Sequence, residues 1–267
     1  MAKPLLQRHR AILAEARRVG RVTVEELAAA LGRTPQTIRK DLNQLCDDGH
    51  LNRTHGGAEL PTALDNVRYA ERRRIARDEK EAIGRAVAAM IPDRASIFIN
   101  VGTTTEEVAS ALADRSGLLV ITNNLNVVDI LASSDLEVIV AGGRFRAADR
   151  AMIGPFAAEF IRNFKVDIAI IGASAIDGDG TLLDYDVSEV EVARAIISNA
   201  RSVILASDSG KLTRSAPVRI TSITDIDHFV TDRIDDDKFR ALCERENVHL
   251  VEACRESAIP EAAKTKK

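Results

Sequence analysis

The first fifty residues contain three short stretches in which apolar side chains recur every three or four positions, the spacing of an amphipathic helix. The first stretch ends at Gly20, and the second lies between Thr23 and Gly32. Thr23 and Glu26 have the spacing of a capping box, so we expect the second helix to begin there. The third stretch opens with Thr34 as a predicted N-cap. Three helices and a short turn are therefore predicted for this segment.

Beyond residue 79 the pattern changes to short β-branched runs that alternate with helical stretches. Such alternation predicts an α/β fold, a doubly wound and largely parallel sheet with helices on both faces. The expected strands are 96–101, 118–122, 136–141, 166–173, 202–207, 226–230 and 248–251. The expected helices are 79–90, 105–113, 124–132, 155–163, 187–200 and 235–246.

These patterns divide the chain into four parts. We expect a winged helix-turn-helix domain over 1–58, a linker over 59–78, a larger ligand-binding domain over 79–255 and a disordered tail over 256–267. The linker contains the run Arg72-Arg73-Arg74, which we interpret as a solvated helix face.

Composition excludes several classes of protein. A chain of 267 residues with 45% hydrophobic and 29% charged residues is expected to fold in water. No uninterrupted apolar run is long enough to span a membrane, and the N-terminus lacks a signal-peptide pattern, so we expect a cytoplasmic protein. Three scattered cysteines argue against a disulfide framework or a zinc site. The 3% of aromatic residues and the lack of tryptophan argue against stacking on single-stranded nucleic acid.

The net charge of −3 conceals an asymmetry between the two predicted domains. Residues 1–57 hold ten basic and six acidic residues and carry +4, so the remainder carries −7. A basic N-terminal domain on an acidic body indicates a nucleic-acid partner for the first domain only.

The third predicted helix begins with polar side chains that suit contact with double-stranded DNA. Amide and guanidinium groups bind base edges in the major groove, whereas hydroxyls and helix N-termini bind phosphates. The segment 50–57 predicts a two-stranded wing. The candidate DNA-binding residues are Thr34, Gln36, Thr37, Arg39 and Lys40 in the helix and Arg53 and His55 in the wing.

Glycines and small polar residues follow each of the first five predicted strands. In parallel sheets, ligands bind at the carboxyl ends of the strands. The segment 102–105 leads directly into a helix, whose N-terminus favours an anion, and Lys211 or Arg144 could add positive charge. The candidate site residues are Gly102, Thr103, Thr104, Thr105, Asn123, Asn124, Gly142, Gly143, Arg144, Asp184 and Lys211.

These features predict a small phosphorylated ligand and exclude others. The chain lacks both the glycine fingerprint of dinucleotide-binding proteins and the phosphate loop of nucleoside triphosphatases. Residues 177–182 resemble the start of a calcium loop, but Leu182 stands where a glycine is required, so we predict a hairpin turn. We expect no cofactor and no metal.

The run Thr34-Pro-Gln-Thr-Ile-Arg-Lys-Asp-Leu-Asn-Gln-Leu and the segment Gly49-His-Leu-Asn-Arg-Thr-His-Gly-Gly-Ala58 resemble the signature of the DeoR family of bacterial transcriptional regulators. The resemblance implies that the third helix reads DNA. The body resembles the family's effector domain, whose fold is shared with ribose-5-phosphate isomerase. That enzyme has Gly-Ala-Asp where this chain has Gly172-Ala173-Ser174, and a serine cannot act as the carboxylate base.

The resemblance can be narrowed within the family. The segments Thr122–Val127, Ile176–Gly180 and Leu182–Asp186 are most similar to members that control glycerol phosphate metabolism. This implies a non-enzymatic repressor released by glycerol 3-phosphate, acting as a homo-oligomer, either a dimer or a tetramer. Two alternatives remain open: a regulator that responds to another sugar phosphate, and a sugar-phosphate isomerase.

Overall fold

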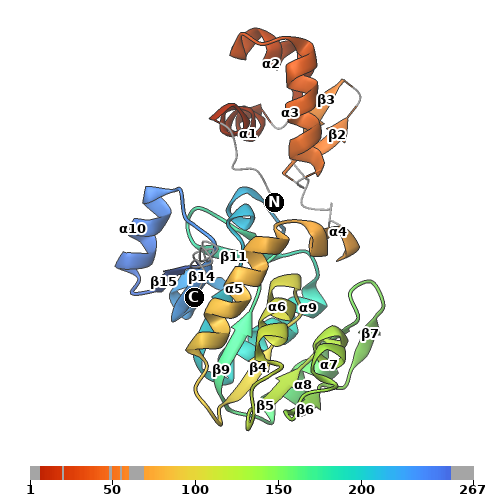
Figure 1. Ribbon diagram of the computed structural model, residues 1–267, viewed down its shortest axis with the longest axis vertical. Helices are drawn as coiled ribbons and strands as arrows, with labels where there is room; N and C mark the ends of the chain where they lie inside the picture. Colours follow the sequence, from red (N-terminus) through yellow and green to blue (C-terminus); the bar gives the residue numbers. More distant parts are fainter. Residues whose placement is uncertain (1–6, 20, 48–49, 55, 60–68, 254–267) are drawn as a thin grey trace, which may run out of the picture.

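The computed structural model describes residues 7–19, 21–47, 50–54, 56–59 and 69–253. Figure 1 shows a small N-terminal domain above a larger α/β domain, with helix α4 (Tyr69–Arg74) between them. Each domain has its own hydrophobic core. His55 lies outside the described residues.

The N-terminal domain consists of α1 (Gln7–Val19), β1 (Arg21–Thr23), α2 (Val24–Leu31), α3 (Pro35–Asp47), β2 (Asn52–Thr54) and β3 (Gly57–Glu59). The capping box of Thr23 and Glu26 is confirmed, and Gly32 ends α2 with a left-handed φ of 60°. The wing is also confirmed, but it has a third strand that the sequence did not predict. The sheet order is β1-β3-β2, so β1 adds to the outer edge of β3.

The larger domain contains a seven-stranded sheet in which all neighbouring strands are parallel. Its strands are β4 (Ser96–Ile99), β5 (Leu119–Thr122), β6 (Glu137–Val140), β9 (Val166–Ile171), β12 (Ala200–Ala206), β14 (His228–Thr231) and β15 (His249–Glu252). In the order β15-β14-β12-β9-β4-β5-β6, strands β5 and β6 follow β4 on one side, whereas β9, β12, β14 and β15 are added on its other side. The order of strand addition therefore changes direction between β4 and β9. Such a reversal opens a crevice at the carboxyl ends of the strands, where ligands bind.

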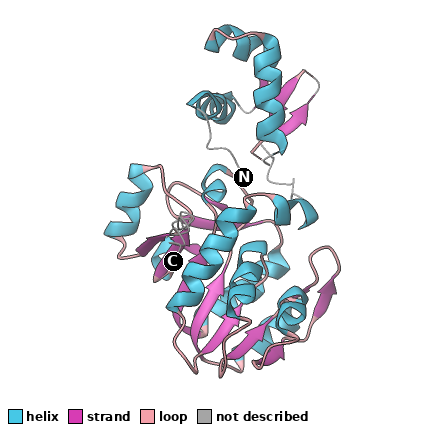
Figure 2. Ribbon diagram, in the orientation of Figure 1, coloured by secondary structure: helices cyan, strands magenta, loops and turns pink. Residues whose placement is uncertain are grey.

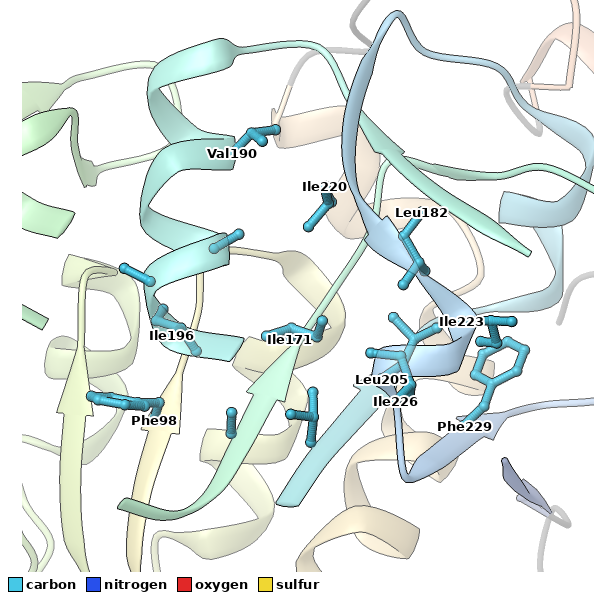
Figure 3. Close-up of a cluster of buried hydrophobic side chains, with 14 of the residues drawn as sticks. Phe98, Ile171, Leu182, Val190, Ile196, Leu205, Ile220, Ile223, Ile226 and Phe229 are labelled. Atoms are coloured by element: carbon cyan, nitrogen blue, oxygen red, sulfur yellow. The ribbon is translucent and has the colours of Figure 1, made fainter. Parts of the chain in front are cut away.

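Helices cover both faces of this sheet, as predicted (Figure 2). One face is covered by α5 (Arg77–Met90), α6 (Thr103–Leu112) and α7 (Leu125–Leu131). The other face is covered by α8 (Pro155–Arg162), α9 (Val187–Ser198) and α10 (Asp237–Arg245). Figure 3 shows the core on this second face, where Phe98, Ile196 and Phe229 are fully buried.

In the described part of the larger domain, five short strands and two 3-10 turns lie outside the predicted alternation. The hairpin β7 (Arg144–Arg146) and β8 (Ala151–Ile153) and the small sheet of β10 (Ala175–Ile176), β11 (Thr181–Asp184) and β13 (Val218–Ser222) were not expected as strands. Two 3-10 turns, η1 (Ser209–Thr213) and η2 (Ile223–Asp225), complete the domain. The hairpin turn at 177–180 is confirmed, because the amide of Gly180 donates to the carbonyl of Asp177 at 2.9 Å. No helix among the described residues is long and apolar enough to cross a membrane.

Candidate functional site

Helix α3 presents its polar residues to solvent. Ile38, Leu42 and Leu45 are buried in the domain core, which fixes the orientation of the helix. The opposite face carries five of the predicted DNA-binding residues, of which Thr37 is half-buried and Thr34, Gln36, Arg39 and Lys40 are exposed. The side chain of Arg39 is 62% exposed, and the Glu25 carboxylate lies 4.0 Å from its guanidinium. This surface can therefore contact a duplex without rearrangement of the core.

The first turn of α3 and the wing are held by short hydrogen bonds. The amide of Thr37 donates to the Thr34 hydroxyl at 3.3 Å, so Thr34 caps the helix as predicted. Arg53 is exposed on β2, and its guanidinium donates to the Asn43 amide oxygen on α3 at 2.5 Å. This bond connects the wing to the third helix.

An internal ion pair joins α1 to α3. The Asp41 carboxylate is buried, accepts from the Arg8 guanidinium at 2.8 Å and lies 3.2 Å from Nε2 of His9. Burial alone would raise the pKa of Asp41, but the hydrogen bonds from Arg8 and His9 outweigh it and lower that pKa. This ion pair holds α3 in a fixed orientation relative to α1.

In the larger domain, the ends of three strands converge around Gly172. A Cβ added there would lie 3.9 Å from the carbonyl oxygens of Val101 and Ala206 and from the Thr105 methyl group. Seven of the predicted site residues are buried. Six lie in the segments that follow strands of the main sheet, namely Thr103, Thr104, Thr105, Asn123, Asn124 and Lys211, and the seventh, Asp184, ends β11 of the small sheet. Gly142, Gly143 and Arg144 are exposed, and Arg144 donates to the Ser188 hydroxyl at 3.1 Å.

Some of these buried groups are already bonded within the protein. The Thr105 hydroxyl reaches the carbonyls of Asn100 at 2.7 Å and Gly102 at 2.8 Å. The Asn124 amide donates to Glu106 at 3.1 Å, and its oxygen accepts from the amide of Asn126 at 2.9 Å. Thr105 and Asn124 therefore shape the loops rather than offer free groups to a ligand.

Other polar atoms at the same edge have no hydrogen-bond partner among the described residues. They are Oδ1 of Asn100, Oδ1 of Asn123, Oγ of Ser207 and Oδ2 of Asp208, each in a residue that follows a strand of the main sheet. Buried polar atoms are nearly always hydrogen-bonded in folded proteins. A polar ligand or water in the crevice would satisfy them.

Four cations lie close together near the Asp208 carboxylate at this edge, namely Lys211, Lys80, Arg214 and Arg72. Lys211 is buried, and burial together with the repulsion from Arg214 lowers its pKa well below the usual range. Burial would raise the pKa of Asp208, but the charges of Lys211, Lys80 and Arg214 outweigh it and lower that pKa. The excess of positive charge is the electrostatic signature of an anion site.

Three members of this cluster were missed in the sequence. Lys80 lies on α5, more than a hundred positions from Lys211, and no local pattern connects them. The interpretation of the arginine run as a solvated face holds for Arg73 and Arg74 but is wrong for Arg72. The side chain of Arg72 is only 14% exposed, and its guanidinium lies 3.6 Å from the Asp149 carboxylate. No sequence pattern pointed to Arg214, which follows η1.

A second network is acidic and is centred on Arg146 of β7. Its guanidinium bonds Glu189, Asp149 at 2.6 Å and Asp186 at 3.2 Å. Burial and the neighbouring Asp184 raise the pKa of Glu189 to about 8. Arg146 was not predicted, because Arg144 two positions earlier carries the same charge and the sequence does not say which one turns inward.

Helix α4 lies against both networks. The Tyr69 hydroxyl donates to Glu106 at 2.6 Å, and Arg72 faces Asp149. From α5, the Lys80 ammonium donates to the carbonyls of Arg72 at 2.5 Å and Ile75 at 2.8 Å. A cation at the carbonyl end of a helix is favourable. The segment that leads to the N-terminal domain is therefore held by residues of the same cationic cluster.

The N-terminal domain also touches the larger domain directly. Arg10 on α1 forms an ion pair with Asp235 at 3.0 Å. A Cβ added at Gly210, in the turn that carries Lys211, would lie 3.7 Å from Cε1 of His50. Within the described residues, no group of three or more histidine, cysteine or acidic side chains could hold a metal ion.

Both halves of the chain match models of one family. Residues 8–63 match the "DeoR-like helix-turn-helix domain", and residues 75–233 match the "DeoR C terminal sensor domain". The chain is 43% identical over 227 residues to the "Glycerol-3-phosphate regulon repressor" of Escherichia coli, an alignment that covers 85% of this chain and 90% of that protein. It is 38% identical over 216 residues to the "HTH-type transcriptional repressor CsqR" of the same organism, covering 80% and 83% of the two chains.

Solved structures with a related fold are more distant. Ribose 5-phosphate isomerase A from Neisseria gonorrhoeae is 14% identical, with a TM-score of 0.38 over 51% of this chain and 54% of that one. The translation initiation factor eIF-2B from Pyrococcus horikoshii is 16% identical, with a TM-score of 0.42 over 83% and 86% of the two chains.

Proposed function

Because the chain belongs to the DeoR family of transcriptional regulators, which are not enzymes, we propose that it represses genes of glycerol phosphate metabolism and is released from its operator by glycerol 3-phosphate. It acts as a homo-oligomer on double-stranded DNA. One observation carries the proposal: the chain joins an exposed polar helix face to a buried cluster with excess positive charge.

The DNA-binding part of the proposal rests on α3 and the wing. Gln36 and Arg39 supply the amide and guanidinium groups that read base edges, and Thr34 and Lys40 suit phosphate contacts. Arg53 lies on the wing that is bonded to α3, so it contacts the adjoining backbone or minor groove. His55 is a further candidate for DNA contact from its sequence position alone.

The effector part rests on the buried edge of the sheet. A phosphate dianion would offset the charges of Lys211, Lys80 and Arg214, which burial makes costly. The hydroxyls of a glycerol moiety match the unpartnered oxygens of Asn100, Asn123 and Ser207. Glycerol 3-phosphate has both a phosphate and hydroxyls, and repressors similar to this chain are named after it.

Coupling between the two sites runs through α4. The Lys80 ammonium now bonds the carbonyls of Arg72 and Ile75, and an anion in the crevice competes for that ammonium. A ligand shifts a conformational equilibrium only by its difference in affinity for the two states. Loss of the Lys80 bonds to α4 supplies such a difference and changes how the DNA-binding domain is held.

A fluorescence anisotropy titration tests the proposal. The protein is bound to a labelled promoter fragment from the glycerol-utilisation genes of its own genome, and glycerol 3-phosphate is added up to millimolar concentration. We expect release, with no release by glycerol or inorganic phosphate. Release by fructose 1-phosphate or ribose 5-phosphate in its place would contradict the effector assignment but keep the regulator, and a failure to bind any promoter fragment would contradict the repressor itself.

A further inference from the structure

The phenylalanines of this protein fall into two groups. Of the seven in the sequence, Phe98, Phe229 and Phe239 are fully buried in the core. The other four lie on the β7–β8 hairpin, on α8 and just after it, namely Phe145, Phe156, Phe160 and Phe164. Phe156 is 80% exposed and Phe145 is 49% exposed. Phe160 and Phe164 are partly buried against the core, so Phe145 and Phe156 are the exposed rings. Exposed aromatic side chains indicate an interaction surface.

Helix α8 carries the centre of this surface. Ala157, Ala158 and Ile161 face the core and fix the orientation of the helix. Phe156 and Phe160 are one turn apart and lie on one side of its outer face, and the Phe160 ring packs against Phe164 at a centroid distance of 5.4 Å. One side of α8 therefore carries aromatic rings, with Phe156 largely exposed and Phe160 partly covered by the core.

The other side of the same face carries two opposite charges. The Arg162 guanidinium and the Glu159 carboxylate are both largely exposed and lie 3.1 Å apart. An exposed ion pair one turn apart contributes little to the stability of its own helix. The outer face of α8 thus has an aromatic side and a side with one acid and one base.

We propose that a second copy of this chain docks on the outer face of α8, antiparallel and about a two-fold axis. Such an axis places the aromatic side of one helix against the aromatic side of the other. It also sets Glu159 beside the partner's Arg162 and Arg162 beside the partner's Glu159, which replaces one internal ion pair by two across the interface. A face with one acid and one base is self-complementary only in this arrangement.

A second copy is also what the proposed function requires, and the inference rests on that function. Each chain has one recognition helix, whereas helix-turn-helix proteins read two half-sites with a dimer. Helix α8 lies near the β6 edge of the sheet, far from the N-terminal domain in Figure 1, so docking here leaves α3 accessible. The described chain ends just after β15, at the opposite edge of the sheet, and residues 254–267 are mostly charged or small, so they are a poor match for an aromatic face.

The first test is the molar mass of the full chain by light scattering after size-exclusion chromatography at micromolar concentration. We expect an oligomer for the wild type and half that mass or less for Phe156→Glu. Ala241→Glu adds the same charge to an exposed position of α10 and should leave the mass unchanged. An unchanged mass for Phe156→Glu would overturn the proposal, as would a monomeric wild type.

Charge reversal tests the two-fold arrangement itself. Glu159→Arg and Arg162→Glu each place like charges across the interface, so each variant alone should dissociate. An equimolar mixture of the two should associate again, because each reversed charge then meets its opposite. A merely structural role for the ion pair within α8 would not let the mixture recover.

These outcomes separate the interface from the function. A monomeric wild type that still binds promoter DNA would remove the interface and leave the regulator. An oligomer that dissociates as expected but binds no promoter DNA would leave the interface and remove the regulator. Deletion of residues 254–267 that dissociates the oligomer, while Phe156→Glu does not, would assign the contact to the tail and overturn the α8 interface.

Discussion

On α3 the functional side chains project from a small core into solvent, whereas at the edge of the larger sheet they are buried and bonded to one another. Arg39 and Gln36 can be exchanged without loss of a core contact. Lys80 and Arg72, by contrast, hold α4 in place and belong to the proposed anion site at the same time. The residues of a DNA-binding surface can therefore be distinct from those that hold the fold together. The residues of a site that must transmit a signal cannot.

The largest expected effect comes from Lys211→Met. This substitution keeps the volume of a buried side chain but removes its charge, so we expect the affinity for glycerol 3-phosphate to fall about 100-fold. Because burial and Arg214 already lower the pKa of Lys211, the free energy of unfolding should stay the same or rise by up to about 1 kcal/mol. Calorimetric titration measures the first quantity and urea denaturation the second.

Lys238→Met, at an exposed position of α10, is the control for Lys211→Met and should change neither quantity. DNA affinity should also be retained in both variants. If Lys211→Met bound glycerol 3-phosphate as well as the wild type does, the anion site would lie elsewhere, and the contrast between the two domains would lose its main support.

A smaller effect is expected from Arg39→Ala, which tests the other half of the comparison. Loss of one base-reading guanidinium should weaken promoter binding by about 30-fold, or ~2 kcal/mol. The free energy of unfolding and the affinity for glycerol 3-phosphate should not change, because Arg39 is exposed. Anisotropy titrations on the same fragment measure the binding.

Arg85→Ala removes an equally exposed arginine from α5 and serves as the control for Arg39→Ala. It should bind DNA as the wild type does. Equal losses in the two variants would mean that binding depends on overall charge, and α3 would no longer be the recognition helix.

The same contrast explains what the sequence could predict. The helices and cap of the N-terminal domain follow from neighbouring residues, such as Thr23 with Glu26 and Thr34 with Thr37, so local patterns were sufficient. The alternation of strands and helices in the larger domain could also be predicted from local patterns. Strand β1 and the β7–β8 hairpin were not, because three-residue strands have no period of their own.

The buried charge networks were beyond local patterns for a different reason. Arg146 bonds Glu189 across 43 positions of the chain, and Lys80 on α5 shares a cluster with Lys211 in η1. Only the topology brings such pairs together. Lys211 could be predicted because it lies in the segment that follows a predicted strand, whereas Arg72 stood in a run that resembles an ordinary solvated helix face.

The smallest expected effect concerns pH and the acidic network. In the folded protein the pKa of Glu189 is about 8, above its usual value of 4.5, so the folded state holds a proton that the unfolded chain releases. The stability that this proton provides is complete below about pH 4.5 and declines as pH rises toward 8.

Glu189→Gln cannot ionise and should remove about 1–2 kcal/mol of this decline. Urea midpoints at pH 5, 6.5 and 8 measure it, with the exposed Glu137→Gln as control. Parallel pH curves for wild type and Glu189→Gln would show that Glu189 is ionised beside Arg146 throughout, and the acidic network would then differ from the cationic one only in sign.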